Sequence, residues 1–290
     1  MVLVILAGSA AAYWLVRRQL RPLEQLAASV KALEADNMAQ IKVPLPNTRD
    51  ESYQLALALD DMITRVGQAY AGQKEFAASA AHELRTPLAA MQSRLEVFLM
   101  KERTPDEYQQ LLQRFDGNLK RLNTLVEQLL QLSSSHVPDT KCGICLGDIV
   151  EDAVCELAPV LEQKTVDINL EDHLLVDENP ALYRQLVLNL LQNAAKYGGA
   201  RIRVHLAQQE NQVTLRVEDN GPGIPDTAKE HIFEPFYRVD RSRSRRIGGN
   251  GLGLSIVRRI ARQYGGDATV GDSPLGGACL VIHLPLSKSG

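Results

Sequence analysis

The chain has 290 residues, of which 45% are hydrophobic and 23% are charged, and this length exceeds what one compact domain usually holds. Its net charge of −3 and pI near 6.1 exclude a general electrostatic attraction to nucleic acid, so a basic patch has to be argued locally. The four cysteines are too few and too scattered for a disulfide scaffold, which fits a reducing compartment.

The first segment, residues 1–17, is apolar. Residues 2–16 carry no charge, and as a helix they would cover ~22 Å, somewhat less than the ~30 Å hydrocarbon core of a bilayer. Arginines follow the apolar run, and Tyr13 and Trp14 stand near its end, which favours a membrane span over a cleavable signal peptide. We predict a transmembrane helix, incomplete or the last of two, with the following residues on the cytoplasmic side.

Residues 18–70 contain two helical patterns that flank a connector. Apolar residues repeat at heptad spacing over 23–33 and again over 55–66, and the prolines of "KVPLPNTRD" separate the two repeats. Each stripe is too narrow to be buried by its own chain, so we expect an all-α four-helix bundle in a dimer; an ordinary juxtamembrane linker is the alternative. "RPLEQL" and "DESYQLALALDDM" resemble the HAMP signal-relay module, with Pro22 and Glu51 at the positions that mark that family.

Residues 71–136 predict an all-α helical hairpin. Apolar residues recur at heptad spacing over 84–98 and over 108–129. Between these stripes, Thr104 is a natural N-cap, and Glu107 completes a capping box that starts the second helix. Two such hairpins would pair into the four-helix core of a homodimer.

His82 lies at the start of the first stripe, in "FAASAAHELRTPLAAM". It precedes Leu84 by two residues, about 200° around a helix, so the stripe turns it outward. Glu83 can accept a proton from one ring nitrogen and leave the other nitrogen free to attack, while Pro87 removes a backbone donor and bends the helix beyond. A nucleophile is therefore favoured over two alternatives, a metal ligand and an exposed histidine without a role.

"HELRTPL" resembles the H-box of the sensor histidine kinases, the membrane-bound half of bacterial two-component systems. The resemblance implies that His82 is the phosphoacceptor and that Glu83 is its acid–base partner. Kinases of this family often also dephosphorylate their response regulators, with a threonine three residues after that glutamate. Thr86 occupies this position.

The C-terminal part, residues 141–287, predicts an α+β sandwich, a mixed sheet with helices on one face. We expect helices and strands in this order: helix 147–163, strands 166–170 and 174–177, helix 180–195, strands 200–207 and 211–219, a long loop, helix 252–264 and two closing strands. "QQEN" between the middle strands predicts a hairpin.

Polar and glycine-rich clusters lie at several points along this predicted domain. Asn189 and Asn193 share one helix face, and their neutral oxygens suit Mg²⁺ held jointly with phosphates. Lys196, one turn on, can reach a phosphate, and Tyr197 can lie against a base. Asp219 ends an apolar strand in "VEDNGPGIP", whose glycines let a ligand approach the backbone; a plain turn is the alternative.

Two further clusters follow. "GGNGLGLSIV" places glycines directly before an amphipathic helix, whose free amides and positive end suit an anion. Before it, "HIFEPFYRVDRSRSRRIGG" has little apolar periodicity, which favours a functional lid. We expect its arginines to cover phosphate rather than nucleic acid or solvent.

In this order and spacing, the clusters resemble the N, first glycine, F and second glycine boxes of the ATPase fold shared by histidine kinases, gyrase, Hsp90 and MutL. The resemblance implies ATP and Mg²⁺ as cofactors, with Asn193 as the metal ligand and Asn189 beside it near the phosphates. The other implied nucleotide contacts are Lys196 on phosphate, Tyr197 against adenine, Asp219 on the adenine amino group, Gly221 and Gly223 in the first glycine box, Phe233 and Phe236 as lid anchors, Arg238 toward the phosphates, and Gly249, Gly251, Leu252 and Gly253 at the phosphates. Hydrolytic relatives carry Glu at the position of Asn189, so water attack is disfavoured here.

Together, these expectations predict a sensor histidine kinase that autophosphorylates His82 and passes the phosphoryl group to an Asp of a response regulator. The same protein is expected to have phosphatase activity toward that regulator. A phosphatase-dominant or pseudokinase scaffold is the alternative. An ATP-driven conformational machine is a further one, against which the H-box and Asn189 argue.

The expected partners are a second copy of the chain, the response regulator and the membrane, without nucleic acid. The expected location is the bacterial inner membrane, with the HAMP, phosphotransfer and ATP-binding domains cytoplasmic. Cys142 and Cys145 form a C-x-x-C without a second pair, so they are expected to pack at a domain junction rather than to bind zinc or sense redox state. The stimulus, the regulator and the subunit that phosphorylates His82 stay open.

Overall fold

The computed structural model describes residues 5–6, 8–10, 13–14, 51–133, 143–177, 179–209, 211–240 and 249–286. The chain forms two compact units, Met1–Ala81 and His82–Gly290. Most of the predicted span over 1–17 and the whole first helical pattern of the predicted relay module lie outside the described residues. In the part of the chain that is described, no helix is both long and apolar enough to cross a bilayer.

Helix α2 (Glu51–Leu99) begins in the first unit and continues into the second. In its first part the buried apolar side chains are Ala56 and Ile63. Within one chain, three residues of the predicted stripe instead keep 44–61% of their surface exposed: Leu55, Met62 and Val66. The four-helix dimer expected for this segment stays a prediction.

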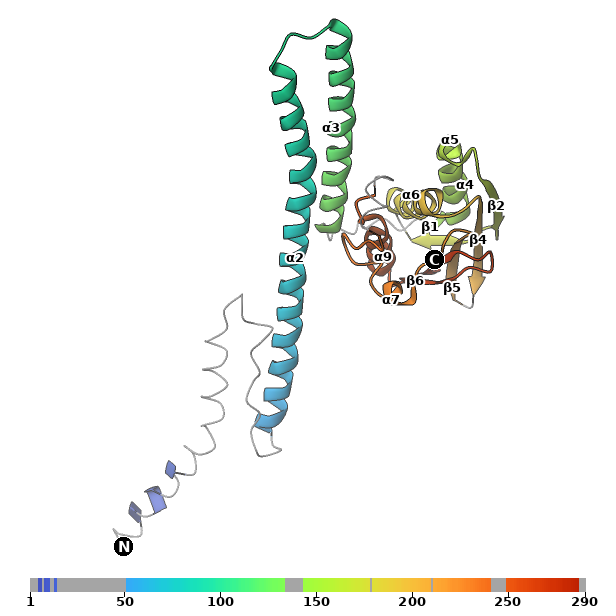
Figure 1. The fold of residues 1–290 in the computed structure, drawn as a ribbon. Coiled ribbons are helices and arrows are strands. Elements are labelled where there is room, and N and C mark those ends of the chain that lie inside the picture. The colour runs from blue at the N-terminus through green and yellow to red at the C-terminus, as the bar shows by residue number, and fades with distance from the viewer. Residues whose placement is uncertain are drawn as a thin grey trace. The chain divides into compact units, whose positions relative to one another are not determined.

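In the second unit, α3 (Pro105–Ser133) follows the end of α2 and completes a helical hairpin (Figure 1). The predicted capping box is confirmed: the Thr104 amide donates to Glu107 Oε2 at 2.9 Å, and the Glu107 amide donates to Thr104 Oγ1 at 3.4 Å. The hydrogen bond from the Thr104 amide, with a smaller contribution from Arg103, holds the pKa of Glu107 below its usual value. These contacts fix where the second helix begins.

The apolar stripes of the hairpin are only partly covered by its own chain. Of the stripe residues Met91 is buried and several are half-buried, whereas six keep 41–66% of their surface exposed. The exposed members are Leu88, Leu95, Tyr108, Leu112, Leu119 and Val126. An apolar stripe of this length is typical of a surface that a partner covers.

The C-terminal domain contains a five-stranded mixed sheet, as the sequence predicts. Its strands are, in spatial order, β2 (Thr165–Leu170), β4 (Arg201–Gln209), β5 (Gln212–Asp219), β7 (Ala278–Pro285) and β6 (Asp267–Asp272). The pairing of β2 with β4 is parallel, and the other three pairings are antiparallel. A separate two-stranded ribbon joins β1 (Gly143–Cys145) and β3 (Leu175–Asp177).

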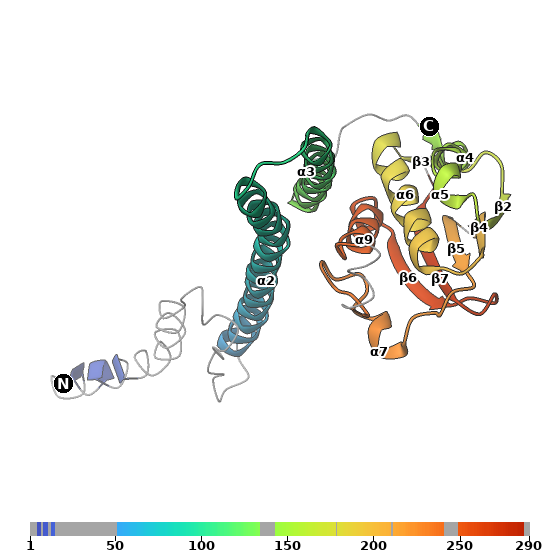
Figure 2. The ribbon, with the colours of Figure 1, turned by 45° about the horizontal axis from the view of Figure 1, so that its top comes forward.

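Helices α4 (Leu146–Glu156), α6 (Pro180–Tyr197) and α9 (Gly253–Gln263) cover one face of this sheet (Figure 2). Alternate residues of β4, which are Ile202, Val204 and Leu206, are fully buried beneath them. This pattern is what a strand with one covered face requires. The arrangement leaves the C-terminal end of α6, the loop after β5 and the start of α9 free to form a site.

Three elements differ from the prediction, and one of them is β1, a strand that the sequence analysis does not predict. The single helix expected over 147–163 is divided into α4 and α5 (Ala158–Leu161), with the break at Leu157. Pro159 explains the break, because it has no amide to donate to the carbonyl four residues earlier and its ring clashes there. A short helix, α7 (Asp226–Lys229), lies inside the segment expected to be a loop.

Candidate functional site

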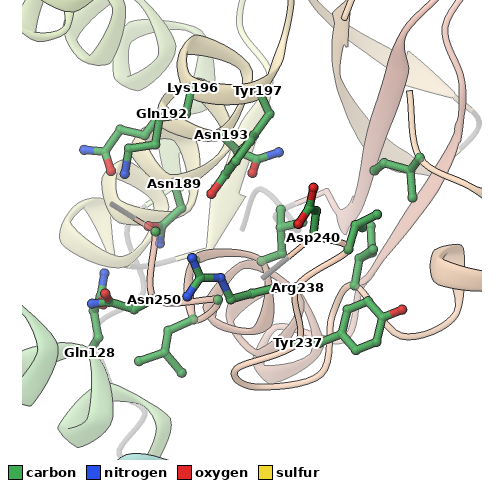
Figure 3. A pocket seen from close by; sticks show the side chains of 18 of the residues that line it. Gln128, Asn189, Gln192, Asn193, Lys196, Tyr197, Tyr237, Arg238, Asp240 and Asn250 are labelled. Atoms are coloured by element: carbon green, nitrogen blue, oxygen red, sulfur yellow. The ribbon is translucent and has the colours of Figure 1, made fainter. Parts of the chain in front are cut away.

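A cavity of about 420 Å³ opens beside α6 and the start of α9 (Figure 3). It brings together residues of all four clusters that the sequence singles out. The predicted site residues that line it are Asn189, Asn193, Lys196, Tyr197, Gly223, Arg238, Gly249, Gly251, Leu252 and Gly253. Asp219, Gly221, Phe233 and Phe236 do not line it, although the last three each adjoin a lining residue in the sequence.

Helix α6 carries the polar face of the cavity. The helix begins sharply because the Asn179 side chain accepts hydrogen bonds from the amides of Ala181 and Leu182, at 3.2 and 3.3 Å. One turn separates Asn189 from Asn193, so both amides face the cavity. Nδ2 of Asn189 is buried without a hydrogen-bond partner among the described residues. A buried amide in this state favours a ligand that accepts hydrogen bonds.

Asp219 ends β5 and is 7% exposed. Its Oδ1 accepts hydrogen bonds from the amides of Gly221 at 2.7 Å and Ala278 at 3.3 Å. A Cβ at Gly277 would lie 2.2 Å from the same oxygen, and one at Gly198 would lie 2.7 Å from the Asp219 Cβ. Glycines thus permit the backbone to close around this carboxylate and hold it in one orientation.

A hydrogen bond between backbone atoms joins the second glycine cluster to the segment that precedes it. The Phe236 amide donates to the Gly251 carbonyl at 2.9 Å, and both residues have positive φ, 64° and 72°. Phe233 is buried, and the guanidinium of Arg258 lies 5.1 Å from the centre of its ring. Residues 241–248, which include four of the five arginines of this segment, lie outside the described residues.

Cationic side chains converge on the cavity. Arg121, Lys196 and Arg238 line it, and Nε and Nη2 of Arg238 are buried without a partner in the part of the chain that the structure describes. Burial, and then the nearby Arg121 guanidinium, lower the pKa of Lys196. Asp240 is the acidic residue that lines the cavity with them. Together with the neutral amides, this charge distribution suits an anionic ligand.

Several lining residues are absent from the sequence-based prediction. They are Arg121, Thr124, Gln128, Gln192, Pro222, Ile224, Ile232, Tyr237, Val239, Asp240, Asn250 and Leu254. The first three are spaced by three and four residues and share one face of α3, but this spacing alone does not show that the face meets the ATP-binding domain.

His82, Glu83 and Thr86 lie on α2, outside the cavity. His82 is exposed, as its position beside the apolar stripe predicts. The Thr86 hydroxyl donates a 3.0 Å hydrogen bond to the His82 carbonyl, and α2 stays helical through Pro87. The structure therefore presents the imidazole to solvent on a regular helix.

Neither a metal-ligand cluster nor a cysteine pair is seen in the described ranges. They contain no group of three or more His, Cys, Asp or Glu side chains that could hold a metal ion. Cys145 lies in β1 with a free thiol, and Cys142 lies outside the described residues. Burial, with the adjacent Glu218 carboxylate, raises the pKa of the Cys279 thiol to about 11.

Three family models match the chain. Residues 178–288 match the histidine kinase-, DNA gyrase B- and HSP90-like ATPase, residues 73–136 match the His Kinase A (phospho-acceptor) domain, and residues 14–68 match the HAMP domain. Among curated proteins, the sensor protein CutS of Streptomyces coelicolor is 32% identical over 280 residues, which cover 94% of this chain and 67% of CutS. The chain spans 60–67% of the length of such relatives.

Solved structures share the fold. The histidine kinase AdeS of Acinetobacter baumannii gives a TM-score of 0.58 at 22% identity, over 71% of this chain and 98% of AdeS. Histidine kinase ThkA, in a crystal structure with the response regulator protein TrrA, gives a TM-score of 0.57 at 23% identity, over 73% of this chain and 61% of that chain.

Proposed function

Because the chain belongs to the sensor histidine kinases of two-component systems, we propose that it transfers the γ-phosphoryl group of ATP to His82 and then to an aspartate of a response regulator. The observation that carries this proposal is the single cavity that unites Asn189, Asn193 and Lys196 with the glycine segment 249–253. The family resemblance and the cavity thus point to the same chemistry.

The polar end of the cavity fits a magnesium–triphosphate complex. The Asn189 and Asn193 amide oxygens are hard, neutral ligands, which suit Mg²⁺ that is shared with phosphate oxygens. We assign Asn193 as the protein ligand and Asn189 as its neighbour at the phosphates. When bound, Mg²⁺ neutralises charge on the phosphates. Lys196 and Arg238 supply the remaining positive charge from this chain.

The other end of the site is assigned to the adenine. Oδ1 of Asp219 is already occupied by two amides, whereas Oδ2 has no hydrogen-bond partner among the described residues. Oδ2 can therefore accept a hydrogen bond from the exocyclic amino group that adenine carries at C6, where guanine has a carbonyl oxygen. Tyr197 would lie against the base, and Gly221 and Gly223 would let the base reach the end of β5.

At His82, a neutral ring nitrogen attacks the γ-phosphorus, the bond from that phosphorus to the bridging oxygen breaks, and ADP leaves. The proton on the other ring nitrogen passes to Glu83, which leaves a neutral phosphohistidine. The phosphoryl group then moves to a regulator carboxylate and His82 is regenerated. In the phosphatase reaction, Thr86 would release the His82 carbonyl and position water to attack the phosphorus of the regulator's aspartyl phosphate, which breaks the bond from phosphorus to the carboxylate oxygen and releases inorganic phosphate.

The partners follow from the same hairpin. We propose that the exposed apolar residues of α2 and α3 form a homodimer by building a four-helix core. A response regulator would dock on the same bundle; the ThkA structure with TrrA supports this choice of partner. We assign domains to residues 18–70 as HAMP relay, 71–136 as phosphotransfer hairpin and 141–287 as ATP-binding domain. The apolar residues 1–17 would anchor the chain in the bacterial inner membrane.

Calorimetric titration of the whole chain tests the assigned site. The non-hydrolysable analogue AMP-PNP should bind more tightly with Mg²⁺ than with EDTA, and Asn193→Ala should remove most of this difference. Asn123→Ala, on an exposed position of α3 outside the cavity, is the control. Asp219→Asn should lower the preference for ATP over GTP. Unchanged magnesium dependence in Asn193→Ala would remove the metal assignment.

A further inference from the structure

A polar face of α3 forms one wall of the cavity, although α3 belongs to the hairpin rather than to the ATP-binding domain. Arg121, Thr124 and Gln128 line the cavity, and Leu125 lies on the same helix face. Leu125 is 3% exposed and belongs to the same cluster of buried side chains as the core of the domain. The apolar residue thus holds this face of α3 against the domain, and its polar neighbours meet the cavity.

The contacts of these polar residues place them at one end of the site. Arg121 Nη2 lies 3.5 Å from Oδ1 of Asn250, within the glycine segment assigned to the phosphates. Figure 3 shows Arg238 extending toward the side of the cavity where Asn189, Asn250 and Gln128 lie. The α3 face is therefore at the phosphate end.

Unsatisfied polar atoms from separate elements meet in this cavity. Gln128 Oε1 on α3, Asn189 Nδ2 on α6, and Nε and Nη2 of Arg238 are all buried without hydrogen-bond partners among the described residues. Buried polar groups are normally paired, so a set of them around one cavity indicates a polar ligand. The Gln128 amide can present either its oxygen or, after rotation by half a turn, its nitrogen to such a ligand.

The charges lead to the same conclusion. Arg121 and Lys196 are close enough for the guanidinium to disfavour the protonated ammonium. Two cations that repel each other are stabilised when an anion lies between them. A terminal phosphate, with its three non-bridging oxygens, has the charge and the acceptors that this end of the cavity lacks.

We propose that α3 completes the nucleotide site, with Arg121 and Gln128 binding the terminal phosphate of a nucleoside triphosphate, so that the hairpin itself distinguishes ATP from ADP. This inference rests on the proposed function of the cavity. It adds residues of the hairpin to the nucleotide site, because the N, F and glycine boxes all lie in the ATP-binding domain. The hairpin would then make a contact with bound ATP that it does not make with bound ADP.

The test compares affinities of the whole chain for AMP-PNP and ADP, both with Mg²⁺. Arg121→Gln should weaken AMP-PNP binding about tenfold, the effect of one charge-assisted hydrogen bond, and leave ADP binding unchanged. Arg114→Gln is the matched control, since Arg114 lies two turns earlier on the same face of α3, is exposed and does not line the cavity. It should change neither affinity.

Two further variants separate phosphate binding from a structural role. Arg121→Lys should recover part of the lost AMP-PNP affinity, because it restores the charge. Gln128→Glu should weaken AMP-PNP more than ADP, because it places a carboxylate beside the terminal phosphate. Thermal unfolding of each variant checks that the chain folds as the wild type does.

Equal losses for AMP-PNP and ADP in Arg121→Gln would overturn the inference, because they would show that Arg121 only holds α3 to the domain. Unchanged affinities for both nucleotides would also overturn it. These results differ from a failure of the proposed function, in which the wild-type chain itself would bind neither nucleotide.

Discussion

The backbone amide of Phe236, within the segment predicted to be a lid, donates a 2.9 Å hydrogen bond to the carbonyl of Gly251, just beyond that segment. A Cβ at Gly251 would lie 2.9 Å from the Phe236 carbonyl carbon and from the Tyr237 carbonyl oxygen. The chain before and after residues 241–248 is therefore joined at a fixed point, and the glycine is required there by contact as well as by its φ of +72°.

Gly251→Ala should reduce nucleotide affinity more than its effect on backbone conformation explains. A side chain in the left-handed region costs about 1–2 kcal/mol, and the contact with Phe236 must additionally separate the backbones of Phe236 and Gly251. We expect AMP-PNP affinity to fall by at least about tenfold, measured by calorimetry on the whole chain.

Gly265→Ala is the control for this variant. Gly265 has a similar φ of +78°, and a Cβ there would meet nothing within 4 Å. It should lower the thermal stability of the domain and leave nucleotide affinity as in the wild type. Equal affinity losses in the two variants would show that the Phe236–Gly251 contact has no special role.

Asp267 is expected to stabilise the ATP-binding domain in a pH-dependent manner. Its carboxylate accepts hydrogen bonds from Arg258 at 2.9 and 3.2 Å and from Arg262 at 3.1 and 3.3 Å. The Arg258 side chain above all holds the pKa of Asp267 well below its usual range. Since the pKa is depressed in the folded state, the stabilisation is present above the unfolded value of ~3.9 and is lost as the pH falls below it.

Asp267→Asn should therefore lower stability by roughly 1 kcal/mol near neutral pH, a value limited by solvent screening of a carboxylate side chain that is 40% exposed. The difference from wild type should shrink as the pH falls below ~4. Thermal unfolding across this range measures it, with Asp167→Asn, on an exposed position of β2, as the charge control. A difference that is independent of pH would contradict the role of the ionised carboxylate.

The hairpin depends on its capping box. Thr104→Ala removes the hydroxyl that accepts from the Glu107 amide, so the first turn of α3 should lose about 1 kcal/mol. Hydrogen exchange of the amides in that turn should then be about fivefold faster. Gln109→Ala, on an exposed position of the same helix, should leave this exchange unchanged. Equal exchange in both variants would show that the box does not set the start of α3.

Nucleotide affinity should fall at alkaline pH through Lys196. Burial, together with Arg121, lowers the pKa of this lysine in the free protein, and bound phosphate should raise it again. Binding is therefore strongest below the free-state pKa and weakens as the pH rises through it. Lys196→Arg keeps its charge, so AMP-PNP titrations up to pH ~10 should lose this alkaline decline. A decline that persists in Lys196→Arg would assign it to another group.

Much of the fold follows from local sequence signals. The capping box at Thr104 and Glu107 fixes the start of α3, and the alternation in "IRVHLA" fixes which face of β4 is buried. Pro159 shows the limit of periodicity, because the apolar pattern continues across α4 and α5 while the missing amide divides them.

The candidate site was predicted less completely than the fold. Motifs along α6 and the glycine segments are local, so the residues that line the cavity there could be identified from spacing. Arg121 and Gln128 could not, because their role depends on a contact between α3 and residues more than a hundred positions away, such as Asn250. Asp219 is assigned from its place at a strand end, and it is not among the residues that line the cavity.

The central claim is that ATP bound in this cavity phosphorylates His82. The most direct measurement incubates the purified chain with γ-labelled ATP and Mg²⁺, compares wild type with His82→Gln and Asn193→Ala, and tests the stability of the label in acid and in base. We expect label that is acid-labile, base-stable and absent from both variants. Label that appears equally without His82, or ATP binding without any label in the wild type, would contradict the claim and favour a signalling scaffold.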